Sequence, residues 1–280
     1  HPFCPLAVPA VVFAICRRWS GEEAAWWAAI GVFALPILDV PTLPFFFGDW
    51  QYLVPMPAFL GVLFYTNQAM ETGSQRDAVI VGMLLGTLSL YQWLYAGFGA
   101  ILVALTGFYN QNLKPVAIAA AVSVVLFLPN LLKDKWAFSN TFGTSPPNLL
   151  VSTREALNIL TSPGVILILV MGVGFGAMWW YQGDSISKSS VLELTVLFSY
   201  AVWVWSKFTT MEDTWAYGDG YPARAAGYYL CSVLVIGYAI QLSRIDLFSR
   251  FITRRRAMAG VIFVALFTII LIPVRIPPVN

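Results

Sequence analysis

PGVILILVMGVGFGAMWWY, residues 163–181, contains no charged side chain. A helix rises about 1.5 Å per residue, so a run of this length would nearly cross a hydrocarbon core of about 30 Å. Comparable runs recur along the 280-residue chain, 59% of which is hydrophobic and whose mean hydropathy is +0.73. These features predict an all-α protein, and specifically a polytopic transmembrane helical bundle of nine or ten spans.

The apolar runs also predict where the helices lie. Residues 1–280 are expected to form a single transmembrane domain, with the runs at 78–92 and 95–108 joined as a tight hairpin. The expected helices cover residues 3–16, 24–38, 52–68, 78–92, 95–108, 115–132, 163–181, 191–206, 224–243 and 257–274.

The distribution of basic residues predicts the orientation in the membrane. Ten of the 16 Lys and Arg residues fall in alternate connections, including the cluster at 250–256, and an excess of cations marks cytoplasmic loops. The opposite connections, 39–51, 133–162 and 207–223, hold seven of the 14 acids. We therefore expect a multi-pass protein of the cell membrane whose polar chemistry takes place on the extracytoplasmic face.

The stretch TTMEDTWAYGDGYPARAAGYYL, residues 209–230, begins in the connection at 207–223 and enters the next predicted run. It concentrates acids and aromatic rings. Aromatic rings stack on sugars, carboxylates bind hydroxyl groups or act as general bases, and cations bind phosphate. An interfacial aromatic belt beside a solvated loop is the alternative interpretation. The predicted sugar and acceptor contacts are Asp49, Trp50, Asp213, Trp215, Asp219 and Tyr221, and the predicted phosphate contacts are Arg224, Lys133 and Lys135.

Other classes of site find no support in the sequence. It contains no GxGxxG, Walker A, HExxH or GxSxG motif. Its three cysteines, Cys4, Cys16 and Cys231, lack metal-ligand spacing, and only one His is present. We predict no metal site, no cofactor and no nucleic-acid partner.

Six segments follow one another along the chain: HPFCPLAVPAVVFAICRRW, FFFGDWQYLVPMPAFLGVLF, LYQWLYAGFGAILVAL, VVLFLPNLL, YPARAAGYYLCSVLVIGYA and GVIFVALFTIILIPVRIPPV. Together they resemble the later membrane portion of the actinobacterial galactan arabinofuranosyltransferases, which are C-type (GT-C) membrane glycosyltransferases. The resemblance covers most of the chain by position and hydropathy, and Gly48-Asp49-Trp50, Trp93 and Arg224 are similar to features of that family.

The resemblance implies an inverting glycosyltransferase that moves a sugar, such as arabinofuranose, from a polyprenyl-phosphate donor to a cell-envelope glycan. Its partners would be the lipid bilayer, the donor and the glycan acceptor. The family carries its catalytic acid in an early outside loop that has no counterpart here. We therefore expect a fragment that lacks amino-terminal spans and a carboxy-terminal extracytoplasmic domain, with Asp39 and Asp49 as the candidates for a catalytic acid within it. The alternatives from other classes are a transporter or flippase for a lipid-linked or small polar substrate, and a non-catalytic scaffold.

Overall fold

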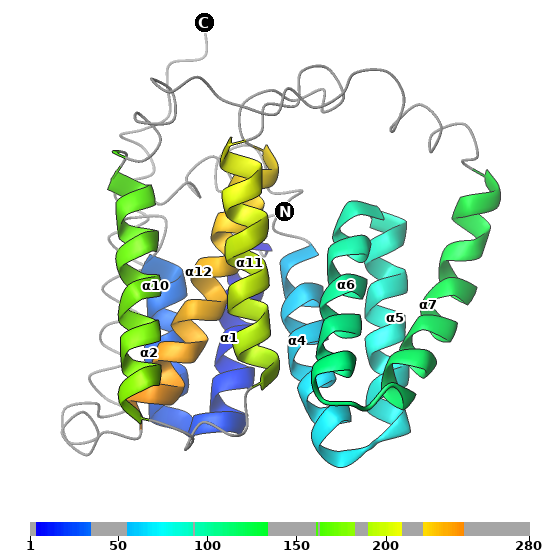
Figure 1. Cartoon of the computed structure of the whole chain (residues 1–280), viewed down its shortest axis with the longest axis horizontal. Coiled ribbons are helices and arrows are strands. Elements are labelled where there is room, and N and C mark those ends of the chain that lie inside the picture. The colour runs from blue at the N-terminus through cyan, green and yellow to red at the C-terminus, as the bar shows by residue number, and fades with distance from the viewer. Residues whose placement is uncertain are drawn as a thin grey trace, which may run out of the picture. The chain divides into compact units, whose positions relative to one another are not determined.

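The computed structural model describes residues 4–34, 55–91, 93–133, 161, 163–182, 190–208 and 221–243. Over these ranges the chain forms nine helices and no strand (Figure 1). The all-helical prediction is confirmed for this part of the chain, and each helix lies within a few residues of a predicted run. The predicted run at 257–274 lies outside the described residues. The helices are α1 (Cys4–Ser20), α2 (Glu22–Ala34), α4 (Pro55–Thr72), α5 (Gln75–Tyr91), α6 (Trp93–Tyr109), α7 (Lys114–Lys133), α10 (Pro163–Gln182), α11 (Ser190–Phe208) and α12 (Tyr221–Leu242).

The prediction of a polytopic transmembrane bundle is wrong for the described residues, because none of their helices combines the length and the apolar character needed to cross a bilayer. The 13 residues of α2 rise only about 20 Å, well short of a hydrocarbon core of about 30 Å. Longer helices include polar turns: α4 ends in TNQAMET, α11 contains Glu193 and Lys207, and α12 carries Arg224 in its first turn. Hydropathy averaged over a run does not register these polar ends.

The described helices fall into two units, and the first contains α1, α2, α10 and the part of α12 from Gly227 onward. α1 and α2 form a hairpin around Gly21, whose φ of 95° is in the left-handed region that favours glycine. Arg17 and Arg18 occupy the last turn of α1, and Glu22 and Glu23 the first turn of α2. Both pairs complement the helix dipoles and stabilise the two helix ends that meet at this turn.

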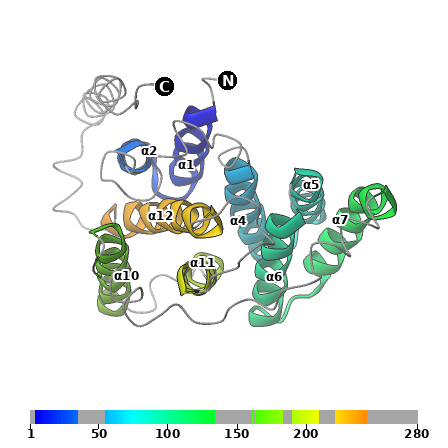
Figure 2. The same cartoon turned by 90° about the horizontal axis from the view of Figure 1, so that it is seen from above.

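α12 is the central helix of the first unit. Figure 2 shows it with α1 and α2 on one side and α10 on the other. Its residues Leu230, Val233, Leu234 and Ile236 have no exposed surface, so the helix is buried nearly all round. Helices that are apolar on every side belong in a core, where they gain most from leaving water. α1 contributes Val8, Val12 and Cys16 at helical spacing to the core of this unit.

The second unit contains α4, α5, α6, α7, α11 and the start of α12 up to Ala226. α4 and α5 are joined by Gly73 and Ser74, which stabilise the end of one helix and the start of the next. Gly73 closes α4 with a φ of 68°, and its N–H donates to the Ala69 carbonyl at 3.0 Å. Ser74 caps α5, because its Oγ accepts from the Asp77 N–H at 3.3 Å. Capping of this kind stabilises a helix by about 1 kcal/mol, and it fixes the start of α5.

Close helix packing in the second unit depends on glycines in α5. Gly82 and Gly86 are four residues apart and face α7, where a Cβ at position 82 would lie 2.6 Å from the Ala119 carbonyl oxygen. A Cβ at position 86 would lie equally close to Leu126. Two glycines at this spacing form a smooth strip that lets two helix backbones approach. α6 packs on α11 through Phe98 and Phe198, whose ring centroids are 6.1 Å apart.

Candidate functional site

Some of the predicted site residues lie within the described ranges, and the others lie outside them. The structure places Lys133 at the last residue of α7, and Tyr221 and Arg224 in the first turn of α12. It therefore describes the helix positions of these three residues, two of which, Tyr221 and Arg224, share one helix turn. The other predicted residues lie outside the described ranges: Asp39, Asp49, Trp50, Lys135, Asp213, Trp215 and Asp219.

The start of α12 is the part of the predicted site that the structure defines best. The helix begins at Tyr221, and Pro222 occupies its second position. Pro is tolerated in the first turn, where its missing N–H would have no helical partner. Tyr221 and Arg224 are three residues apart and therefore lie on the same side of the helix.

The charge at this helix start departs from the usual pattern. The free N–H groups of a first turn carry partial positive charge, which favours acids and disfavours cations by about 0.3–1 kcal/mol. α2 and α5 follow the rule with Glu22, Glu23 and Asp77, whereas the first turn of α12 has no acid and contains Arg224. An arginine in this turn adds a positive charge to a helix start that is already partly positive. Such a combination suits an anion such as phosphate.

α7 also begins with a cation, Lys114, but this residue is the first of its helix and exposed to solvent. Solvent screens a charge in that position, so its cost is small. Lys133 has the opposite placement, at the carboxy-terminal end of α7, where a cation complements the dipole. The helix dipole therefore favours Lys133 at its position and disfavours Arg224 at its own.

The body of α12 is held firmly by α10. The Tyr238 hydroxyl donates to the Met171 carbonyl oxygen at 2.6 Å, and the Tyr238 ring meets Phe175 edge-on, with centroids 6.1 Å apart and an interplanar angle of 74°. Gly174 leaves room for the Tyr238 hydroxyl, and Gly237 leaves room for the Phe175 ring. α10 and α12 therefore interlock through complementary rings and glycines. Tyr238 was not among the predicted residues; its signal in the sequence is a tyrosine in an apolar helix, with a glycine-rich apolar run at 163–181 elsewhere in the chain.

Buried thiols are not candidates for nucleophiles. Burial raises the pKa of the Cys231 thiol to about 12 and raises the pKa of the Cys16 thiol still further. The reactive form of cysteine is the thiolate, so both groups stay protonated and unreactive near neutral pH. Both side chains are fully buried and act as small apolar residues of the core.

Hydroxyl groups inside the second unit are mostly satisfied within their own helices. Thr106 and Thr195 are fully buried and donate to the carbonyl four residues earlier, at 2.8 and 2.6 Å. Ser89 donates to the Gly86 carbonyl at 2.6 Å. These bonds stabilise buried side chains and leave them no free donor for a substrate. Among the described residues, no three His, Cys, Asp or Glu side chains lie close enough together to hold a metal ion.

Comparison of the chain with protein-family models, with characterised proteins and with solved structures finds no match. The resemblance to the galactan arabinofuranosyltransferases therefore stays a prediction, and the function has to be argued from the chemistry of the chain itself.

Proposed function

We propose that this protein transfers a sugar from a polyprenyl-phosphate donor to a glycan acceptor. The observation that carries the proposal is Arg224 in the first turn of α12, where the helix dipole disfavours a cation. Residues that break a local rule are concentrated at functional sites. A phosphate bound at this turn would reverse the penalty, because it would interact favourably with both the guanidinium and the free N–H groups.

The segment before this turn supplies the other groups that glycosyl transfer needs. Asp213 and Asp219 are carboxylates that can bind sugar hydroxyls, and Trp215 and Tyr221 are rings that can stack on a sugar face. Asp49 and Trp50 offer the same pair of groups elsewhere in the chain. Sugar, hydroxyl and phosphate would therefore each have a chemically matched partner within a short length of sequence.

The proposed reaction is an inverting displacement. An oxygen of the acceptor hydroxyl forms a bond to the anomeric carbon while the bond from that carbon to the donor phosphate oxygen breaks. A carboxylate accepts the hydroxyl proton, for which Asp39 and Asp49 are the candidates in this chain. The leaving polyprenyl phosphate takes the electron pair, and Arg224 together with Lys133 and Lys135 would stabilise its charge.

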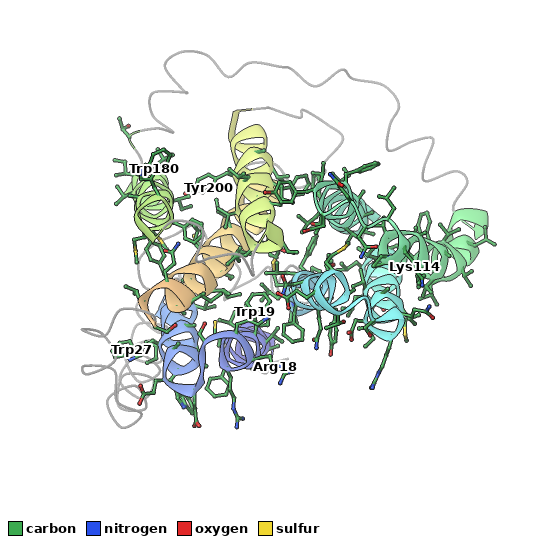
Figure 3. The ribbon with its side chains drawn as sticks, turned by 60° about the horizontal axis from the view of Figure 1, so that its bottom comes forward. Arg18, Trp19, Trp27, Lys114, Trp180 and Tyr200 are labelled. Carbon is green, nitrogen blue, oxygen red and sulfur yellow. The ribbon has the colours of Figure 1, made fainter. Side chains whose placement is uncertain are left out.

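The test replaces the guanidinium with another cation. Arg224→Lys keeps the charge but loses the two parallel N–H donors that match a phosphate. A hydrogen bond to a charged group contributes about 1.5–3 kcal/mol, so we expect transfer from a polyprenyl-phosphate arabinose donor to fall about ten- to hundredfold. Arg18→Lys is the matched control, because Arg18 is an exposed residue in the last turn of α1 and should tolerate the change (Figure 3).

Both variants would be measured in the full chain, with folding checked by circular dichroism. Normal transfer by Arg224→Lys would show that the residue has a structural role. Equal losses in both variants would show that the assay reports stability and not phosphate binding.

A further inference from the structure

α7 presents a long aliphatic surface, here called the α7 face. Its residues recur every three or four positions and therefore line one side of the helix. Val124 and Val125 are 59% and 70% exposed, and Leu128 is 47% exposed. No charged residue interrupts α7 between Lys114 and Lys133. The α7 face consists of Ala117, Ala120, Ala121, Val124, Val125 and Leu128.

The opposite side of α7 is already occupied. Pro115 and Ala119 are buried, and Val122 lies against Gly82 of α5. Among the described helices of its unit, α7 packs on α5 and α6, and Figure 1 shows it at the edge of the group, with its Lys133 end diverging from the other helices. Packing inside this unit therefore does not cover the α7 face.

α10 repeats the arrangement in the other unit. Its exposed residues also recur at helical spacing, and α10 contains no Asp, Glu, Lys or Arg. Val173 is 74% exposed and Trp180, near the end of the helix, is 90% exposed (Figure 3). Trp has an apolar body and a polar N–H, which suits a boundary between hydrocarbon and water. The α10 face consists of Ile166, Leu169, Val170, Val173, Ala177 and Trp180.

We propose that the α7 face and the α10 face contact the hydrocarbon chains of a lipid layer. Contiguous exposed apolar surface is costly in water, and on proteins it usually marks a binding surface. The residues that dominate protein–protein binding are enriched in Trp, Tyr and Arg, whereas the α7 face has only Ala, Val and Leu.

The charges at the ends of the α7 face complement a lipid and not a second apolar helix. Lys114 is exposed at one end, and Lys133 is the residue at the other. A lysine side chain can lie along apolar surface while its ammonium group reaches the phosphates of lipid headgroups. The proposal does not depend on glycosyl transfer, because it rests on exposed apolar residues that take no part in the proposed reaction.

Fluorescence quenching by labelled lipids tests the contact directly. Val125→Cys and Val173→Cys would be made separately in a Cys4→Ser chain and labelled with bimane, since the buried Cys16 and Cys231 do not compete for the dye. Gln75→Cys, at an exposed polar position of α5, is the control. Each labelled chain would be mixed with vesicles of phosphatidylcholine and phosphatidylglycerol that carry a nitroxide on the acyl chain.

We expect the acyl-chain nitroxide to lower the fluorescence of the labels at positions 125 and 173 and to leave the label at position 75 unchanged. Vesicles without nitroxide provide the reference intensity, and circular dichroism confirms that each labelled chain is folded. Intensities at 125 and 173 that do not differ from the control would overturn the proposal. A blue shift that depends on protein concentration and occurs without lipid quenching would also overturn it, because it would identify a protein partner on these faces.

Discussion

Replacing Gly82 with alanine should destabilise the packing of α5 on α7. The added Cβ would lie 2.6 Å from the Ala119 carbonyl oxygen and 2.7 Å from the Val122 Cβ, whereas ordinary contacts are 3.4–4 Å. One neighbour is a backbone atom and the other is bonded directly to the backbone, so neither can rotate away. The two helices must therefore move apart by most of an ångström.

The size of the effect follows from two opposing contributions. Overpacking costs typically about 1–3 kcal/mol, and this site belongs near the upper end because rigid atoms clash. Replacing glycine with alanine in a helix returns about 1 kcal/mol. The overpacking cost exceeds the gain in helix preference, so we expect Gly82→Ala to lower the free energy of unfolding by about 1–2 kcal/mol.

Gly97 provides the matched control. It is an exposed helical glycine in α6, and a Cβ there would meet no atom within 4 Å. Gly97→Ala should gain the helix preference without the clash and raise the free energy of unfolding by about 0.5–1 kcal/mol. The same chemical change is thus expected to have opposite signs at the two positions.

Thermal unfolding of the full chain, followed by circular dichroism, measures the difference. A change of 1 kcal/mol shifts the midpoint by about 2–4 °C in proteins of 150–250 residues, so the two variants should differ by several degrees. If Gly82→Ala were as stable as Gly97→Ala, the close approach of α5 and α7 would be refuted.

Two further outcomes follow from the described packing. Gly174→Ala should destabilise the chain, because the added Cβ would lie against the Tyr238 hydroxyl. The loss should be much smaller in a Tyr238→Phe background, where that oxygen is gone and the ring carbon behind it lies 3.6 Å away. Unfolding of the two single variants and of the double variant measures the non-additivity. Because burial raises the pKa of both thiols, Cys16 and Cys231 should resist iodoacetamide at about pH 8 in a folded Cys4→Ser chain and should react after denaturation. Mass spectrometry measures the alkylation of each residue. Alkylation of either cysteine in the folded chain at the rate of the unfolded chain would contradict its burial.

Apolar runs in the sequence predicted the positions of the described helices well. The run at 163–181 corresponds to α10 at Pro163–Gln182, and the hairpin predicted around Trp93 corresponds to α5 and α6. α12 begins three residues before the predicted 224 because Pro222 fits the first turn of the helix. Helix positions are accessible from sequence because long uncharged runs and Gly or Pro breaks are local signals.

The faces of these helices were much harder to predict. In α10, Ile168 and Phe175 are buried while Val170 and Val173 are exposed, yet all four are large and apolar. Helical periodicity separates inside from outside only when the two sides differ in polarity. The glycine pair at positions 82 and 86 was the available signal for close packing, since two glycines four residues apart form a smooth strip.

The site was predictable only as an inventory of chemical groups. Sequence identifies Arg224 as a cation close to acids and rings, and the helix boundary adds that it occupies a first turn, where a cation is disfavoured. Which carboxylate faces which ring depends on connections outside the described ranges. No local pattern fixes such contacts, because loop conformation depends on the elements around it.

The phosphate contact and the lipid contact are proposed on separate residues. Arg224 carries the first, and the exposed residues of the α7 face and the α10 face carry the second. The two proposals can therefore fail independently. If position 125 is quenched by lipid and Arg224→Lys transfers normally, the protein contacts lipid but binds the donor phosphate through other residues. If Arg224→Lys loses transfer and position 125 is not quenched, the phosphate contact stands and the α7 face does not contact lipid.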